Sequence, residues 1–466
     1  MADSRLSALE AFLKDYPSIK YIPPSSADFA SVREVWYHGR RDTPLAILQP
    51  QSAEEVSLLV KYAKENGIQF TVRVGGHNLE GRAIVDGALV IDLRALTSVT
   101  VADDLQSATV QGGILQQDLA IKLWSKGLVT PIGTIPAVGY VGWATYGGYG
   151  PFSSHWGLGV DQIIGATVVN SNGDIIKADE NLLKGIRGAG GTFGVIVDVT
   201  VKVYPLKSLL AGAIIFDAQD ICKALTEFNA AYRRLLEDGL PSELTIQQLV
   251  YNAPPGRLFG VSFFWSSDNT EEGQRWKEKI ASLGPVIMNT VALKNIPDWV
   301  TEMRALVPSS VYGGGSHTHN LKQITTEAAQ VLGRNLSKMP SDPACMFSVH
   351  QLRGPSTSHS TNDSNFTYKN NSVFAEREPH YMLEILGFST TEENKHVCEQ
   401  WASDLANQFQ QETDTTNILP HAYISLDPIN NGNMVRIFGS HAEEVFALKK
   451  TYDPDNVFAL ALPLLK

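Results

Sequence analysis

The chain has 466 residues, of which 43% are hydrophobic and 19% charged, as in a large globular protein with about three domain-sized units. Its 38 basic and 49 acidic residues give a net charge of −11 without a Lys/Arg-rich block, which argues against nucleic-acid binding. Three widely spaced cysteines exclude a disulfide framework, and no apolar run is long enough to span a membrane. Because no signal-peptide pattern is visible, we expect a cytoplasmic protein.

A strand, a helix and a second strand are predicted first in the chain. Residues 45–48 form a short apolar run, and residues 68–74 alternate between apolar and polar side chains, as strands do. Ser52 and Glu55 have the spacing of a capping box, which predicts a helix that begins there and ends at Gly67. Further strands, helices and glycine turns continue to about residue 205.

Gly75 and Gly76 end the second strand and are followed directly by His77. Glycine lacks a Cβ, so the backbone N–H groups of such a pair approach a phosphate closely. A histidine next to the pair lies beside the molecule that carries the phosphate. The motif therefore predicts a phosphate-containing ligand at this loop.

Glycine-rich loops and one long strand occupy residues 127–204. Residues 127–150 and 156–161 are rich in glycine and aromatic residues, and residues 188–194 read Gly-Ala-Gly-Gly-Thr-Phe-Gly. Valine at every odd position of 195–203 predicts a strand. A helix precedes the 188–194 loop and a strand follows it, which reverses the order of a Rossmann dinucleotide fingerprint. We therefore reject a Rossmann interpretation.

After Pro205 the pattern changes to longer helices separated by strands. Helices are predicted over 218–236, 270–283 and 321–338, strands over 258–265 and 381–386, and a polar surface loop over 355–372. This pattern favours an α+β second domain with an antiparallel sheet. The predicted domains are 1–205, 206–420 and 421–466, and a helix over 440–451 returns the last segment to the first domain.

Four segments in this order resemble the motifs of the FAD-linked oxidases of the vanillyl-alcohol oxidase (PCMH-type) superfamily. They are 73–78, 127–161, 188–195 and, as in the berberine-bridge-enzyme-like branch, 452–458. The resemblance implies an α+β fold: a PCMH-type FAD-binding domain of two α/β subdomains, and a substrate domain with an antiparallel sheet covered by helices. It also implies FAD bound covalently through His77. The implied FAD contacts are Arg73, Val74, Gly75, Gly76, His77, Asn78, Pro136, Val138, Gly139, Gly142, Trp143, Thr145, Tyr146, Gly148, Tyr149, Gly190, Gly194, Val195, Ile196 and Asn456.

The chain departs from the family pattern at three positions. Members with two covalent bonds to the flavin carry a cysteine where this chain has Ile135, so the resemblance implies attachment through His77 alone. Tyr146 replaces a glycine and narrows the space beside the flavin, where Trp143 also lies. Asn78 replaces a serine but keeps a hydrogen-bonding side chain. Asp161 is expected to have a structural role in the FAD-binding domain.

Substrate oxidation usually needs a base that removes a proton, and three residues are candidates. Glu384 lies where the resemblance places a carboxylate base, and Tyr423 resembles the first tyrosine of a family motif. His350 lies on a strand that could face the flavin. The alternatives are an exposed strand face for Glu384, core packing for Tyr423 and a satisfied sheet histidine for His350.

The predicted function is oxidation of a small substrate by hydride transfer to FAD, with O2 or another acceptor taking the electrons. Trp143, Tyr146, Tyr149 and Phe438 favour a hydrophobic or aromatic substrate. The alternatives are an FAD-dependent dehydrogenase, a flavin-scaffolded non-redox cyclase of specialised metabolism, and a non-catalytic binding protein. His317 and His319 share a predicted strand face but have no third ligand nearby, so no metal is predicted. No feature of the sequence specifies an oligomeric state.

Overall fold

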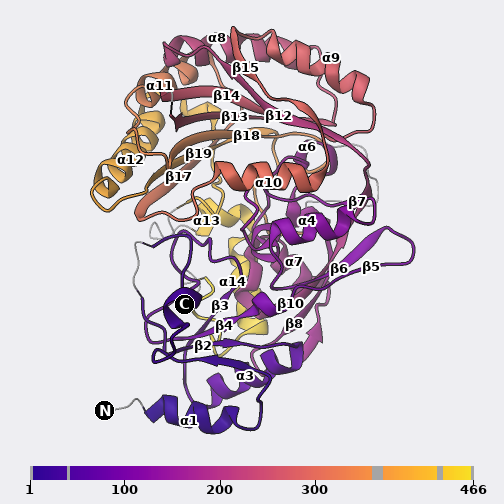
Figure 1. The fold of residues 1–466 in the computed structure, drawn as a ribbon, viewed down its shortest axis with the longest axis vertical. Helices are drawn as coiled ribbons and strands as arrows, with labels where there is room; N and C mark the ends of the chain where they lie inside the picture. Colours follow the sequence, from indigo (N-terminus) through magenta and orange to yellow (C-terminus); the bar gives the residue numbers. More distant parts are fainter. Residues whose placement is uncertain (1–3, 39–41, 255, 359–370, 428–433, 463–466) are drawn as a thin grey trace.

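The structure is a computed structural model that describes residues 4–38, 42–254, 256–358, 371–427 and 434–462. Two parts are stacked along its longest axis, with a large sheet and its helices above and two smaller sheets below (Figure 1). The segment 359–370 of the predicted polar loop lies outside the described residues. No helix in the described ranges is both long enough and apolar enough to cross a bilayer.

The first small sheet is formed at the start of the chain. Its order is β1-β2-β4-β3, where β2 and β3 pair parallel with β4, and β1 pairs antiparallel with β2. The elements are α1 (Ser4–Leu13), β1 (Lys20–Ile22), α2 (Phe29–Val32), β2 (Ala46–Gln49), α3 (Ala53–Glu65), β3 (Phe70–Arg73) and β4 (Leu89–Asp92). The Ser52 side chain accepts a hydrogen bond from the Glu55 amide, which begins α3 as predicted.

The second small sheet is antiparallel, with the order β5-β6-β10-β8-β9. Its strands are β5 (Val99–Val101), β6 (Ser107–Gln111), β8 (Ile163–Val169), β9 (Ile175–Lys177) and β10 (Val195–Lys202). The helices of this region are α4 (Gln116–Trp124), α5 (Tyr140–Thr145), α6 (Ser153–Trp156) and α7 (Glu180–Ala189). The short strands β7 (Leu128–Val129) and β11 (Tyr204–Pro205) pair with each other.

Strand β10 is less regular than its valine pattern predicted. A register shift against β8 lies between Ile196 and Asp198. Val195 and Val197 therefore pack into the core under the first sheet, whereas Val199 and Val201 pack into the core under the second. The irregularity lets one strand fill two cores, and a strict alternation of residues cannot show this.

The upper part is one antiparallel sheet, as predicted, and the described residues give it nine strands. Its order is β15-β12-β14-β13-β18-β19-β17-β20, with β16 also paired to β12. The strands are β12 (Leu209–Phe216), β13 (Leu244–Ala253), β14 (Gly256–Trp265), β15 (Val286–Asn289), β16 (Ala292–Lys294), β17 (Gly313–Leu321), β18 (Cys345–Leu352), β19 (His380–Ser389) and β20 (Ile418–Leu419). The helices α8 (Ile221–Glu237), α9 (Thr270–Ala281), α11 (Thr326–Leu336) and α12 (Lys395–Glu412) cover its outer face, while α10 (Ile296–Leu306) packs against α4 below (Figure 1).

One predicted helix begins later than expected. Residues up to Leu321 belong to β17, and α11 begins only after Thr325, whose side chain accepts a hydrogen bond from the Ala328 amide. The run Gly313 to Asn320 has no apolar alternation, so the sequence indicated a strand only around His317 and His319 and not the full length of β17.

The two faces of the large sheet have different partners. On β19, Leu383 and Ile385 pack under the outer helices. Met382 and Leu386 lie on the opposite face, where they pack with residues of the lower part such as Tyr149 and Leu79. Because strand side chains alternate, Glu384 lies between them on the face toward the glycine loops.

The C-terminal segment lies against the lower part. Helices α13 (Met434–Phe438) and α14 (Ala442–Tyr452) pack near α7 (Figure 1). Lys449 donates from Nζ to the Thr192 carbonyl oxygen at 3.0 Å, and to Asp453 at 2.6 Å. The Asp453 carboxylate also accepts from the amides of Val457 and Phe458. The C-terminal segment thus supports the third glycine loop through the bond from Lys449 to Thr192.

Candidate active site

The first two glycine loops meet backbone to backbone. A Cβ at Gly75 would lie 2.6 Å from the Gly139 amide nitrogen, and a Cβ at Gly139 would lie 2.7 Å from Cγ1 of Val74. Neither position therefore accommodates a side chain. Gly76 has φ of +68°, a left-handed conformation that favours glycine. The carbonyls of Pro136 and Val138 accept bonds from Gln117 and Gln116 at the start of α4, which fixes the second loop.

The third glycine loop joins them through Tyr146. Gly190 has φ of +59°, and a Cβ there would lie 2.5 Å from the Tyr146 ring. The tyrosine that replaces a family glycine is thus accommodated by a glycine on the facing loop. Three segments that are far apart in the sequence form one continuous surface.

This surface leaves backbone accessible. Gly142 is exposed beside the buried Val141 and the half-buried Trp143, and a Cβ at Gly142 or at Gly191 would meet no atom within 4 Å. Val74, Gly75 and Val138 are also only half-buried although they lie inside the molecule. Accessible glycine backbone beside half-buried apolar side chains fits a ligand with both a phosphate and a flat ring. The residues present therefore fit FAD.

His77 extends the first loop toward the large sheet. Its ring stacks on Trp36, with centroids 5.6 Å apart and an interplanar angle of 22°. Trp36 in turn makes an edge contact with Phe388 of β19 at 5.2 Å. Burial lowers the pKa of His77 to about 4, so its imidazole is neutral near pH 7. A neutral imidazole is the nucleophilic form of histidine.

Glu384 lies on the large sheet with two hydrogen-bonding partners. Oε2 accepts a bond from the Ser348 hydroxyl and lies 3.3 Å from Nε2 of His350. Burial by itself would raise the pKa of Glu384, but the charge and hydrogen bond of His350 outweigh it, and the pKa is lowered. The Glu384 side chain is 18% exposed. The expectation of an exposed strand face is therefore wrong, because the carboxylate is paired within the sheet.

His350 is bonded on the same face of the sheet. Gln247 of β13 lies with Nε2 3.1 Å from the Ser348 hydroxyl and 3.0 Å from Nε2 of His350. Three neighbouring strands thus contribute one polar cluster: Gln247 from β13, Ser348 and His350 from β18, and Glu384 from β19. The opposite, helix-covered face of β18 and β19 contributes Phe347, Val349, Leu383 and Ile385 to an apolar core.

Aromatic side chains lie between this polar cluster and the glycine loops. Tyr149 and Tyr423 make an edge contact at 5.1 Å, and both pack with Phe374. The Tyr149 hydroxyl bonds to Nε2 of His380 at 2.8 Å. Burial first, and the negative charge of Glu384 in addition, raise the pKa of Tyr423 to about 12. The phenol of Tyr423 therefore stays protonated near pH 7, which disfavours it as the base.

Several implied FAD contacts have side chains directed elsewhere. Arg73 is buried and donates to the carbonyls of Val32 and Glu34. Thr145 bonds back to its own helix at Val141. Val195 and Ile196 fill the two lower cores, and a Cβ at Gly194 would collide with Val168. Trp143 donates from Nε1 to the Tyr149 carbonyl oxygen, and the Gly148 carbonyl oxygen accepts a bond from the Gly159 amide. The Asn78 side chain accepts a bond from the Arg82 amide. Asn456 lies in the C-terminal turn with φ of +53°. Arg73, Trp143 and Thr145 therefore use their polar atoms within the protein.

Asp161 lies in the lower part but bonds to residues of a distant segment. Its carboxylate makes two bonds to Arg377, at 2.8 Å and 2.9 Å, and accepts the Ser356 hydroxyl. All three side chains are buried. The segment around Phe374 is thereby fixed above the glycine loops.

Sequence reasoning missed Trp36, Gln247, Ser348 and Phe374, all of which lie at this site. None belongs to a family motif quoted above. Gln247 and Ser348 carry one weak signal, because each is a polar residue within an otherwise apolar strand pattern.

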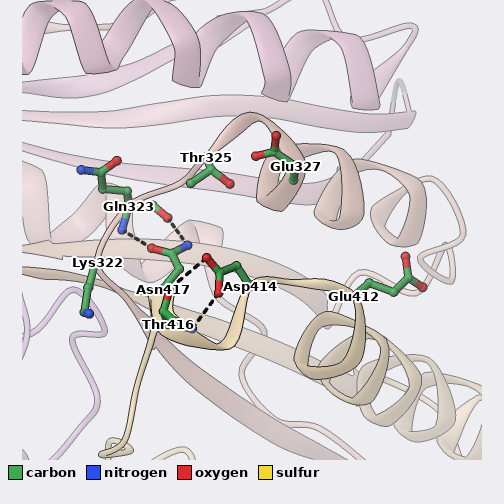
Figure 2. Close-up of a pocket in the computed structure, with 8 residues that line it drawn as sticks. All are labelled: Lys322, Gln323, Thr325, Glu327, Glu412, Asp414, Thr416 and Asn417. Atoms are coloured by element: carbon green, nitrogen blue, oxygen red, sulfur yellow. Dashed lines mark hydrogen bonds between the residues drawn. The ribbon is translucent and has the colours of Figure 1, made fainter.

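Two other polar regions lie apart from this site. His319 turns toward α12, with Nε2 3.1 Å from the Ala406 carbonyl oxygen. A surface depression of about 580 Å³ lies at the β20 end of the large sheet (Figure 2). Asn417 and Gln323 bond to each other there, as do Asp414 and Thr416 (Figure 2). None of its lining residues is aromatic.

The fold and the paired loops define a flavin-dependent oxidoreductase of the PCMH type, and comparison with known proteins agrees. The FAD binding domain family matches residues 44–179. The FAD-linked oxidoreductase aurO of Gibberella zeae is 30% identical over 456 residues, 97% of this chain and 87% of that protein. The chain belongs to the FAD-linked oxidoreductases, as the resemblance implied, and its cofactor is FAD.

Two solved structures show the same fold. 6-Hydroxy-D-nicotine oxidase from Arthrobacter nicotinovorans has a TM-score of 0.81 at 22% identity, over 94% of this chain and 96% of that one. Glucooligosaccharide oxidase from Acremonium strictum, whose FAD is bonded to both a cysteine and a histidine, has a TM-score of 0.80 at 17% identity, over 95% of this chain and 96% of that one.

Proposed function

We propose that this oxidoreductase is an oxidase that removes a hydride from a small aromatic or hydrophobic alcohol, phenol or amine. The observation that carries the proposal is the Glu384–His350 pair, which lies on the sheet face that is turned toward the three glycine loops. A carboxylate kept ionised by a neighbouring imidazole is suited to take a substrate proton or to orient the group that takes it. Bound FAD supplies the hydride acceptor.

Other residues of the chain hold and attach the cofactor in this proposal. The backbone of Gly75, Gly139 and Gly190 forms the surface that holds FAD, and His77 is the attachment point. Ile135 stands where a second attachment cysteine would lie, so we propose a single covalent bond. Dioxygen is the proposed acceptor of the electrons.

The aromatic layer supports a ring-shaped or apolar substrate. Tyr149, Tyr423 and Phe374 surround the approach to Glu384 with apolar surface and exclude water from it. Ser348 and Gln247 hold the His350 imidazole and the carboxylate in place. A substrate that brings its own O–H or N–H to Glu384 replaces the water bonds that this carboxylate loses on burial.

The test is the visible spectrum of the purified protein, followed by acid precipitation and a peroxide assay with aromatic alcohols and amines. We expect a yellow pellet, and with His77→Ala a white pellet under a yellow supernatant. His396→Ala, which removes an exposed histidine, is the matched control and keeps the yellow pellet.

Each contrary outcome overturns a different part. A white pellet from the wild-type protein would refute the covalent bond. Substrate turnover that bleaches the flavin but yields no peroxide in air would indicate a dehydrogenase. Turnover without either signal would indicate a cyclase.

A further inference from the structure

Trp36 lies at the junction of the attachment loop and the large sheet, and no motif accounts for it. Its amide donates to the Gly76 carbonyl oxygen at 3.1 Å, directly before His77. Its own carbonyl accepts from the Val311 amide at 2.8 Å, and the His38 amide donates to the Val311 carbonyl at 2.8 Å. The backbone of this segment therefore bridges the two parts of the molecule.

The indole ring of Trp36 also contacts both parts of the molecule. Nε1 donates to the Pro308 carbonyl oxygen at 3.0 Å, and the ring edge meets Phe388, which is buried in β19. The face of the ring stacks on His77. One residue thus touches the histidine of the first loop and two segments of the upper part.

We infer that Trp36 is a positioning residue for flavin attachment, and that attachment requires the upper part to be docked. The inference rests on the proposed role of His77. Val35 lies against Gly76 on the same segment, where a Cβ would be 2.9 Å from its Cγ1, so the loop has little room to turn. Without the indole, the imidazole gains rotational freedom and loses its fixed plane.

Covalent attachment of FAD through His77 is a two-electron oxidation. A bond forms between an imidazole nitrogen and the 8α carbon of the flavin, while one N–H and one C–H bond break. Two protons and two electrons are released; the electrons reduce the flavin ring, and dioxygen removes them as hydrogen peroxide. Ring alignment governs the first of these events, and misplacement of a reacting group by about 1 Å slows a reaction roughly 100-fold.

The experiment compares full-length Trp36→Ala, Trp36→Phe and Trp124→Ala. Each protein is incubated with FAD in air, and the fraction of flavin that stays in an acid pellet is followed over time. We expect roughly 10- to 100-fold slower attachment in Trp36→Ala. Trp36→Phe keeps a stacked ring but loses the bond to Pro308, so its rate should be intermediate. Trp124 is half-buried on α4 outside this site and is the matched control, with a wild-type rate.

Further measurements separate a positioning role from a structural one. The dissociation constant of FAD in His77→Ala should change less than threefold when Trp36→Ala is added, because the glycine loops are untouched. Phe388→Leu, on the upper part alone, should also slow attachment. Attachment at the wild-type rate in Trp36→Ala would overturn the inference and leave His77 in its role. Absence of covalent flavin in the wild-type protein would instead refute the proposed function.

Discussion

Glu384 lies inside an apolar strand, where an ionised carboxylate is costly unless it is paired. His350 and Ser348 supply that pairing from the adjacent strand, and Ser348 is the residue directly opposite Glu384 in the β18–β19 register. The sequence predicted Glu384 and His350 as separate candidates. It could not predict that they touch, because the pairing and register of β18 and β19 depend on residues far apart in the chain.

Replacing Glu384 by Gln should lower kcat by about 10²- to 10⁴-fold, because the amide cannot act as the base or hold the imidazole. The pKa of Glu384 is lowered, so in the wild type the carboxylate stays ionised at neutral pH, and the loss of rate from its protonation appears only in acid. Steady-state rates against pH measure both effects. Glu393→Gln, an exposed glutamate of the same part, is the control. Unchanged kcat in Glu384→Gln would remove this residue from the mechanism.

At the scale of elements, local patterns predicted α3 from its capping box and a helix before the 188–194 loop, and the structure has both, as α3 and α7. Contacts between distant elements were not predictable. The register shift between β10 and β8 lies where the two small sheets meet. The position of Trp36 depends on its hydrogen bond to Pro308, about 270 residues later in the chain. Asp161 was expected to have a structural role in the FAD-binding domain, but its partner Arg377 lies in another segment and was not predictable.

The Asp161–Arg377 pair should therefore stabilise the junction of the two parts. Asp161→Asn leaves a buried guanidinium without its counter-charge, which costs about 3–5 kcal/mol in unfolding free energy. Asp161→Asn combined with Arg377→Met should recover part of that loss. Arg275→Met, which removes an exposed ion pair with Glu272, should cost less than about 1 kcal/mol. Urea unfolding measures all three, and equal losses for the buried and exposed pairs would contradict the assignment.

The whole molecule buries several histidines in their neutral form. Burial lowers the pKa of His77, His155, His317, His319 and His380, and the value for His77 and for His319 is about 4. The unfolded chain, with an ordinary pKa near 6.5, takes up protons first as the pH falls. The stability that these neutral histidines contribute is therefore fully present above about pH 6.5 and is lost as the pH falls toward about 4.

His319→Gln isolates one of these groups. The wild type should lose about 3 kcal/mol at this residue across that pH window, and the variant should lose correspondingly less. Unfolding free energy by urea at a series of pH values is the measurement. His396→Gln, at an exposed position, should keep the wild-type slope. A variant slope equal to that of the wild type would show that His319 does not contribute.

The hydrogen bond from Lys449 to Thr192 limits when the third glycine loop gains its support during protein synthesis. The two residues are separated by 257 positions in the chain. At about 5–20 residues per second, a ribosome needs roughly 13–50 s to make that interval. During this time the third glycine loop exists without the segment that supports it. The nascent chain must therefore emerge through α14 before the third glycine loop gains this support.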